Sequence, residues 1–508
     1  MSIWVVIRHG FVDSLSGPDY TRGSLESGLI TSGRRDMAEQ RVDTIIRGGK
    51  VVTSSQVFDA AVAIKGEKIA VVGPENLMPK ADRYIDAEGK FVLPGLIDSH
   101  VHLDGHDDYA LGALAAAHAG LTTLVPFGNY ALEGDETLEQ AVRRTQEEVT
   151  ASAVVDFAFH FILQNRPNIL KTLPQAMELG IKSFKMFMTY KKRPGRMCDD
   201  DYICEAMDLV AKGGGVLQLH CESGNIIEYL ENKLIADGHT HPEDFPTACP
   251  DWAEEEAINR AIKMGSATGC PTYVVHLSTQ LGLERIKQAQ AQGQKIWTET
   301  CPQYLLLSDA EMAKFGPMAK IGPPLRPEDG PDQDALWDGL RQGQISLVGS
   351  DHSPHPEELK KPGWDNIFVT PDGASVPFGS PGIETVAPLM YSEGVVKRGF
   401  PIWWLARVMS ENPARIFGLY PRKGIIQAGS DADLLILAPG VDRVVTAADH
   451  LSTAGYSLFE GWKVSGRPWM TLLRGQVLLN DGKLEQKPGY GKFLTSESPI
   501  TPLGGPVD

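Results

Sequence analysis

Cysteine is scarce in this sequence, and the spacing of the few that occur excludes two common uses of the residue. Six cysteines lie within 508 residues, and no two of them form a CxxC pair. In a chain of this length such spacing is typical of reduced thiols rather than of a disulfide framework or a structural zinc site. We therefore expect a protein of a reducing compartment, the cytoplasm.

The features of nucleic-acid-binding and membrane proteins are also missing. The formal net charge is -17 and there is no run of Lys and Arg, so we expect no nucleic-acid partner. No apolar run reaches the ~18 residues that span a bilayer, and no basic-then-apolar signal segment opens the chain, so we expect no membrane partner. Residues 1–41 have no sustained periodicity, and we expect a disordered extension, or sequence ahead of a start at Met37.

Short apolar runs that alternate with amphipathic segments are abundant. Eight such runs cover residues 95–103, 121–129, 154–163, 181–188, 215–223, 272–279, 295–303 and 345–353. Eight strands alternating with helices over about 250 residues predict a (β/α)8 TIM barrel, an α/β fold. A doubly wound open sheet is the competing interpretation, but no glycine-rich phosphate loop follows any of the runs.

Both ends of the chain have a different pattern, with short β-branched strands separated by turns. We expect residues 42–94 and 425–490 to fold together as one small β-sandwich built from both chain ends. The barrel then covers residues 95–424, and residues 491–508 form a C-terminal tail.

Metal-ligand side chains stand where the predicted strands end. The sequence DSHVHLD places His100 and His102 two apart, so both side chains point to the same side of a strand. His220, His276 and Asp351 lie near the ends of three further runs. Each of these alone also fits a structural histidine, a helix cap or a turn. Because a barrel brings the carboxyl ends of its strands together, the set predicts a metal site.

Lys185 lies inside the apolar run IKSFKMFMTY. An unpaired ammonium in a protein interior costs several kcal/mol, so this lysine should be neutral, paired or chemically altered. A desolvated amine is partly free and can take up carbon dioxide to form a carbamate, whose two oxygens can bridge two metal ions. A lysine paired with a buried acid is the alternative, but that interpretation leaves the surrounding histidines without a reason.

Two divalent ions at such a site would share a hydroxide and lower its pKa, which makes a nucleophile near neutral pH. Asp351 can take the proton of the nucleophile and pass it to a leaving nitrogen. Tyr190 follows Lys185 in the loop that leaves the same strand, and its hydroxyl can stabilise an oxyanion. Ordinary packing with a solvent-facing hydroxyl is the alternative role for Tyr190.

Together, the segments LPGLIDSHVHLD, SFKMFMTY, LHCESG, VVHLST, ETCPQYLLL, GSDHSPH and GYGKFL resemble the dihydropyrimidinase/hydantoinase branch of the amidohydrolase superfamily, from about residue 42 to 495. The resemblance implies hydrolysis of small cyclic amides such as hydantoins, dihydropyrimidines or cyclic imides, in a homotetramer or homodimer. It implies two divalent ions, zinc in the first place with manganese or cobalt as alternatives. One ion would be held by His100, His102, Lys185 as N6-carboxylysine and Asp351, and the other by Lys185, His220 and His276.

The sequence departs from this branch at the positions that the resemblance implies for substrate binding beside Tyr190. Gly322 in KIGPPLR stands where the branch commonly has serine, and Phe378 in VPFGSPGIE stands where it commonly has asparagine. The loop after Asp104 is also short. An allantoinase-type ureide hydrolase is the alternative enzyme, because SDHSPHPEELK is similar to allantoinases. A non-catalytic scaffold protein of the same family is the alternative from another class.

Overall fold

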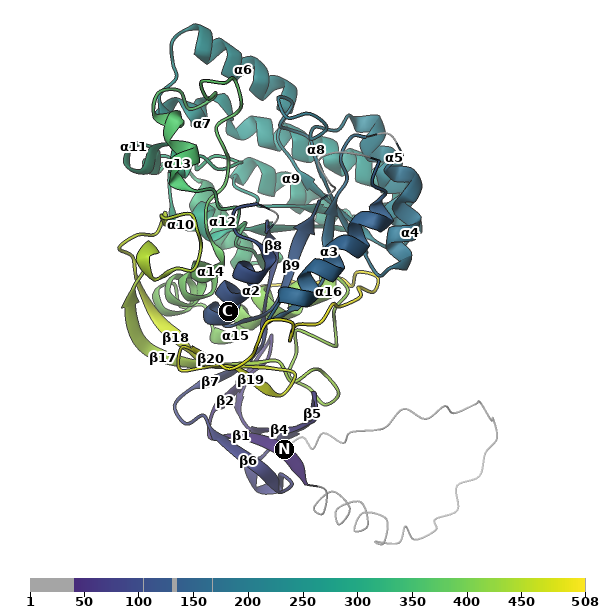
Figure 1. Ribbon diagram of the computed structural model, residues 1–508, viewed down its shortest axis with the longest axis vertical. Coiled ribbons are helices and arrows are strands. Elements are labelled where there is room, and N and C mark those ends of the chain that lie inside the picture. The colour runs from purple at the N-terminus through teal and green to yellow at the C-terminus, as the bar shows by residue number, and fades with distance from the viewer. Residues whose placement is uncertain (1–40, 104, 130–134, 167, 508) are drawn as a thin grey trace.

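The computed structural model describes residues 41–103, 105–129, 135–166 and 168–507 (Figure 1). The extension expected for residues 1–41 lies outside these ranges apart from Arg41, and so does Asp104. Within the described residues, no helix combines the length and the apolar character needed to cross a membrane.

A ring of parallel strands forms the centre of the upper body in Figure 1. Its strands are β8 (Leu96–Val101), β9 (Leu121–Gly128), β10 (Asp156–Phe157), β11 (His160–Ile162), β12 (Ser183–Phe187), β13 (Val216–His220), β14 (Thr272–Val274), β15 (Ile296–Thr300) and β16 (Leu347–Val348). All eight apolar runs therefore contain a barrel strand. The third run gives two short strands in one register, because Asp156 pairs with Thr123 and His160 with Phe127. The His102 N–H donates to the His352 carbonyl at 2.7 Å and brings the two ends of the ring together.

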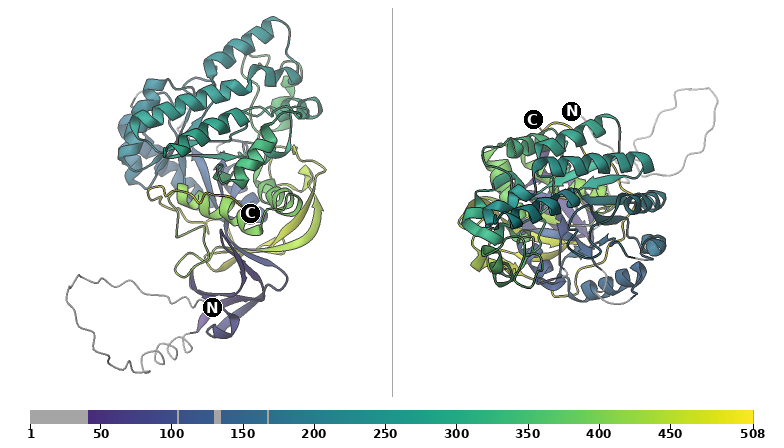
Figure 2. Two further views of the ribbon diagram at one scale, coloured as in Figure 1. Left: turned by 180° about the vertical axis from the view of Figure 1, so that it is seen from behind. Right: turned by 90° about the horizontal axis from the view of Figure 1, so that it is seen from above.

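Helices surround the ring, as the view from above shows (Figure 2). They are α2 (Tyr109–Ala119), α3 (Leu138–Ser152), α4 (Leu173–Glu178), α5 (Asp200–Lys212), α6 (Gly224–Ala236), α7 (Phe245–Ala248), α8 (Asp251–Thr268), α9 (Gln280–Ala291), α10 (Pro302–Leu306), α11 (Glu311–Phe315), α12 (Asp332–Arg341), α13 (Glu357–Lys360), α14 (Ile383–Leu389), α15 (Ile402–Ala406) and α16 (Asn412–Ile416). Shorter or π-helical turns are η1 (Glu75–Leu77), η2 (Leu170–Thr172), η3 (Pro242–Asp244), η4 (Gly316–Ala319), η5 (Lys361–Trp364), η6 (Met390–Lys397), η7 (Arg407–Glu411) and η8 (Ala447–Asp449).

Helix α3 illustrates how the local sequence sets these elements. Thr137 and Gln140 form a capping box that satisfies two of the free N–H groups at the start of the helix. Leu138, Val142 and Val149 are buried at the spacing of one helix face, while charged residues occupy the other face. The helix therefore lies with its apolar side on the barrel.

Two β-sheets lie beneath the barrel in Figure 1. One has the order β20-β19-β18-β17-β7-β2-β3 and the other the order β5-β4-β1-β6. Their strands are β1 (Val42–Arg47), β2 (Lys50–Val52), β3 (Val57–Asp59), β4 (Ala61–Lys65), β5 (Lys68–Gly73), β6 (Ala81–Asp86), β7 (Phe91–Pro94), β17 (Leu434–Val444), β18 (Lys463–Leu473), β19 (Gln476–Asn480) and β20 (Lys483–Leu484).

The chain ends meet inside the first of these sheets, where β7 pairs with β17, Leu434 standing opposite Pro94. The two sheets share one apolar core, to which Ile46 and Ile64 contribute from one side and Leu434 and Ile436 from the other. The predicted fold class, a (β/α)8 barrel with a β-sandwich built from both chain ends, is confirmed.

A buried cluster of charges joins the barrel to the sandwich. The Lys423 ammonium lies 2.6 Å from Asp156, 3.0 Å from Asp431 and 2.5 Å from Asp433. Arg474 forms a further ion pair with Asp156. The three carboxylates lie close enough together to hold a cation, but the lysine ammonium already stands among them. This cluster is therefore a structural clasp between β10 and the sandwich.

The C-terminal tail packs on the barrel along its length. Phe157 donates to the Lys492 carbonyl at 3.0 Å and accepts from the Leu494 N–H at 2.7 Å. Further on, the Val507 N–H donates to the Arg341 carbonyl at 2.7 Å. The tail thus extends the pairing of β10 at the lower end of the barrel.

Candidate functional site

The structure brings the six predicted metal ligands together at the carboxyl ends of the strands. His100 lies in β8, Lys185 in β12 and His220 at the end of β13. His102, His276 and Asp351 follow β8, β14 and β16 by one, two and three residues. The His220 and His276 rings are 4.4 Å apart between centroids, and those of His100 and His276 are 5.4 Å apart.

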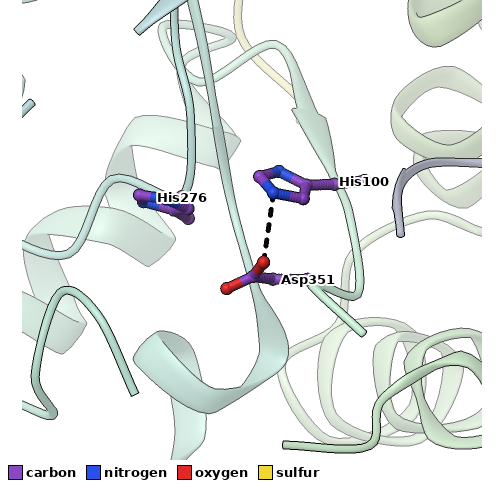
Figure 3. Close-up of side chains that lie close together, drawn as sticks. All are labelled: His100, His276 and Asp351. Carbon is purple, nitrogen blue, oxygen red and sulfur yellow. Dashed lines mark ion pairs between the residues drawn. The ribbon is translucent and has the colours of Figure 1, made fainter. Parts of the chain in front are cut away.

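Asp351 stands between the histidines. His100 Nε2 lies 3.1 Å from Asp351 Oδ1, and His102 Nε2 lies 3.9 Å from the same oxygen. Figure 3 shows His100, His276 and Asp351 pointing toward one another, and one ligand atom from each lies within 4.8 Å of the others. Two imidazoles and a carboxylate at this separation suit a divalent ion such as zinc.

The backbone is strained at three residues of this site. Tyr190, His276 and Asp351 have φ values of 65°, 38° and 51°, in the left-handed region that side chains other than glycine rarely adopt. Such conformations cost about 1–3 kcal/mol each and persist where the surrounding structure imposes them. Three in one cluster indicate that the fold holds these side chains in place for a purpose other than stability.

Lys185 is buried beside two aromatic rings. Its side chain is 1% exposed, and its Nζ lies 5.2 Å from the centre of the Phe127 ring and 5.3 Å from that of Phe187. No carboxylate of the described residues lies within 4 Å of it. Burial lowers the pKa of Lys185 to about 8, although Asp351 and Glu299 oppose the shift. Part of the amine is therefore uncharged near neutral pH.

Two glutamates that the sequence analysis missed orient the histidines. The Glu299 carboxylate forms a hydrogen bond with His100 Nδ1, and Glu222 Oε2 lies 2.5 Å from His220 Nε2. Glu299 also accepts hydrogen bonds from the Tyr273 hydroxyl at 2.9 Å and the His276 N–H at 3.3 Å. A carboxylate on one ring nitrogen leaves the other nitrogen free to bind a metal.

The remaining ring nitrogens of the site are suited to bind such an ion. His276 Nδ1 is buried and has no hydrogen-bond partner among the described residues, and His100 Nε2 lies beside the Asp351 carboxylate. Buried polar atoms without partners are rare in native proteins. Burial alone would lower the pKa of His100, but the Glu299 and Asp351 carboxylates raise it to about 9. Negative charge is thus concentrated where a cation would bind.

A cavity of about 230 Å³ opens above this centre. Of the predicted residues, it is lined by His102, Lys185, Tyr190, His220, His276, Gly322, Asp351 and Phe378, while His100 lies beneath it. The Tyr190 ring is 5.0 Å from that of His220 and 5.1 Å from that of Phe378. Burial raises the pKa of Tyr190, so its phenol stays protonated and can donate a hydrogen bond. A β-carbon on Gly322 would lie 2.5 Å from the Tyr190 hydroxyl.

Comparison with known proteins agrees with this geometry. Residues 91–478 match the model of the Amidohydrolase family. The chain is 35% identical over 462 residues to the D-hydantoinase of Geobacillus stearothermophilus, covering 89% of this chain and 96% of the relative. It is 34% identical over 463 residues to the L-hydantoinase of Paenarthrobacter aurescens, covering 89% and 98%.

Solved structures give the same result. The crystal structure of dihydropyrimidinase from Brevibacillus agri NCHU1002 superposes with a TM-score of 0.84 at 33% identity, covering 90% of this chain and 100% of that one. The chain therefore belongs to the amidohydrolase family. The resemblance to its dihydropyrimidinase/hydantoinase branch is confirmed.

Proposed function

We propose that this enzyme opens the ring of a hydantoin or a related small cyclic amide by hydrolysis of a ring C–N bond. The convergence of His100, His276 and Asp351 at a cavity of about 230 Å³ carries this proposal. The similar proteins are named D-hydantoinase, L-hydantoinase and dihydropyrimidinase. The allantoinase and scaffold alternatives are not favoured. None of these similar proteins is named an allantoinase or a scaffold protein, and all six proposed metal-ligand positions are occupied by residues that can bind a metal.

The six ligand positions fit two divalent ions. Zinc is proposed first, with manganese or cobalt as alternatives, because imidazole and carboxylate ligands suit all three. The first ion would be held by His100, His102, Lys185 and Asp351, and the second by Lys185, His220 and His276. When bound, the ions supply an activated water and neutralise charge that develops on the substrate carbonyl.

Lys185 would be shared by both ions as a carbamate. The free amine attacks the carbon of carbon dioxide, a C–N bond forms, and the nitrogen releases one proton to solvent, which leaves a carboxylate on the side chain. The low pKa of Lys185 and its burial beside the Phe127 ring favour this reaction. The change from cation to anion also removes the cost of a buried ammonium.

Asp351 and Tyr190 would carry the proton transfers and the charge stabilisation. The Asp351 carboxylate accepts a proton from the attacking water and delivers it to the leaving ring nitrogen. The Tyr190 hydroxyl donates a hydrogen bond to the oxygen that becomes negative during the attack. Gly322 and Phe378 line the cavity beside Tyr190, and their backbone groups would hold the ring amide.

The proposed assembly is a homotetramer, with a homodimer as the alternative, and the proposed location is the cytoplasm. We further propose that the sandwich comprises residues 42–94 and 425–490 and the barrel residues 95–424. The pairing of β7 with β17 supports this division.

A substrate panel tests the function. The purified enzyme is supplied with hydantoin, substituted hydantoins, cyclic imides, dihydrouracil and allantoin, and ring opening is followed by absorbance. The loop between β8 and α2 is short, and Phe378 lines the cavity. The pocket around the substrate ring should therefore differ from that of a dihydropyrimidinase, and we expect hydantoin or an imide to be opened faster than dihydrouracil. Dihydrouracil as the best substrate would refute this ranking, and a failure to open any ring would refute the proposed function.

A further inference from the structure

A cation faces the cavity from the loop that follows β12. The Arg193 guanidinium carbon lies 4.9 Å from the centre of the Tyr190 ring and 5.2 Å from that of Phe378, and Arg193 lines the cavity with both. Its side chain is half-buried. The guanidinium therefore contacts the ring of Tyr190, whose hydroxyl is the proposed oxyanion donor.

Within the described part of the chain, Arg193 differs from the two lysines before it in having no acidic partner. Lys191 pairs with Glu228 at 2.9 Å and Lys192 with Glu231 at 2.8 Å, both on α6. Among the described residues, no carboxylate lies within 4 Å of the Arg193 guanidinium, and none accepts a hydrogen bond from its side chain. Contact with two aromatic rings stabilises the charge, but it leaves the N–H groups available to an acceptor.

Hydrogen bonds hold the backbone of the loop at Arg193 in a defined place. The Arg193 N–H donates to the Tyr190 carbonyl at 2.9 Å, and the Arg193 carbonyl accepts from the Arg196 N–H at 3.1 Å. The Cys198 N–H then donates to the Phe187 carbonyl at 2.9 Å and returns the loop to β12. A loop backbone fixed in this way does not have to be ordered when a ligand binds, which lowers the entropy cost of binding.

The wall of the cavity around Arg193 is positive. Asp351 is the one carboxylate among the described lining residues, and it lies at the metal end. Arg196 lines the same cavity. Burial, Lys360, His106 and Arg193 together lower the pKa of His355, which lines the same cavity, to about 4. The positive charges of this wall should therefore attract an anion that enters the cavity, although the net charge of the whole chain is negative.

We propose that Arg193 binds a carboxylate carried on the substituent of the ring, so that the preferred substrates are hydantoin-type cyclic amides with an anionic side chain. This inference rests on the proposed function and specifies its substrate class. A guanidinium binds a carboxylate through two parallel N–H groups, which is stronger and more directional than its contact with a neutral amide. The ring amide would then face the metal ligands while the substituent extends past Tyr190 to Arg193.

Two substrates of equal size test the proposal. The rates of ring opening are compared for 5-(2-carboxyethyl)hydantoin and its neutral analogue 5-(2-carbamoylethyl)hydantoin, with hydantoin and 5-benzylhydantoin in parallel. We expect kcat/KM for the carboxylate to exceed that for the amide by about tenfold or more, mainly through KM. Added salt should reduce this ratio, because it screens a half-buried pair.

The variants separate recognition from folding. Arg193→Gln should reduce the ratio of carboxylate to amide turnover by about tenfold or more, and Arg193→Lys should restore part of it. Lys192→Gln, which removes a neighbouring cation already paired with Glu231, should leave the ratio unchanged. Metal content and thermal unfolding of each variant verify that the site is intact.

Three outcomes would overturn the inference. The first is equal or better turnover of the neutral amide, and the second is an equal loss for both substrates in Arg193→Gln. The third is 5-benzylhydantoin as the best substrate, which would make this wall an aromatic pocket. In each of these cases hydantoin itself is still opened, so the proposed function stands. Failure to open hydantoin or any of its derivatives would instead refute the proposed function and this inference with it.

Discussion

Glu299 and His100 are joined by a hydrogen bond in the interior of the barrel, with both side chains 1% exposed. The carboxylate takes the Nδ1 side of the ring, so Nε2 points toward Asp351. Glu299 is held in turn by the Tyr273 hydroxyl at 2.9 Å. A residue that touches no substrate thus fixes the direction of a proposed metal ligand.

Glu299→Gln should weaken metal binding by about 10- to 100-fold, which is the usual effect of removing a carboxylate behind a ligating histidine. Tyr273→Phe removes one hydrogen bond to Glu299 and leaves the carboxylate, so its effect should be smaller. Competition with a chelator of known affinity measures both. Unchanged metal affinity in Glu299→Gln would show that the hydrogen bond serves packing alone.

Lys185→Ala should lose both metal ions together, because the lysine is the one ligand that the two proposed sites share. Lys185→Arg should do no better, since a guanidinium stays cationic and cannot take up carbon dioxide. Acetate or propionate added to the alanine variant should restore part of the metal content by occupying the place of the carbamate. If the alanine variant kept two ions and normal turnover, Lys185 would be only a buried structural residue.

Gly322→Ser should lower kcat by about tenfold or more, because the new β-carbon would stand 2.5 Å from the Tyr190 hydroxyl and displace the proposed oxyanion donor. Gly105→Ala is the matched control, since Gly105 lines the same cavity and a β-carbon there meets nothing within 4 Å. Steady-state kinetics on hydantoin compares the two. Equal activity of both variants would argue against a catalytic role for the position of the hydroxyl.

Lys423→Met should destabilise the protein by about 3–5 kcal/mol, because it leaves Asp156, Asp431 and Asp433 buried without their shared cation. Lys65→Met, which breaks an exposed pair with Asp43, should cost less than about 1 kcal/mol. Denaturant midpoints of the two metal-loaded variants give the comparison. Similar midpoints would show that the clasp adds no stability.

The charge cluster around Lys423 also predicts how the stability of the fold depends on pH in the acid range. Burial tends to raise the pKa of Asp431, but Lys423 and Lys68 outweigh it and lower the pKa to about 2. A depressed carboxyl pKa stabilises the folded state above the unfolded value of 3.8, and this contribution, about 2 kcal/mol, is lost as the pH falls from 3.8 through 2. Stability measured between pH 5 and 2 should therefore fall less steeply in Asp431→Asn, once normalised to its own value at pH 5. An unchanged slope would contradict the assignment.

The sequence was sufficient to predict the barrel because hydrophobic periodicity is a local signal. Each of the eight runs contained a strand, and the one that gave β10 and β11 kept a single register on β9. The proposed ligands could be located for the same reason, since His100 and His220 end such runs. Residues at strand ends meet in any barrel, so their convergence required no knowledge of the loops.

The rest depended on contacts between distant segments. Glu299 and Glu222 were missed because a glutamate at a strand end is usually taken to face solvent, although Glu222 follows His220 by two residues. The left-handed backbone of Tyr190, His276 and Asp351 has no sequence signal, since glycine is the residue expected there. The approach of Arg193 to Phe378 joins two loops far apart in the chain, which periodicity cannot foresee.

The most direct test of a metal-dependent cyclic amidohydrolase is hydantoin turnover measured on one sample before demetallation, after it, and after addition of zinc, with the metal content determined at each stage. The account predicts two divalent ions per chain at the start and ring opening that falls to background as they are removed. Activity should then return in proportion to the zinc taken up, with manganese or cobalt as substitutes. Full turnover in protein verified to contain no metal would contradict it.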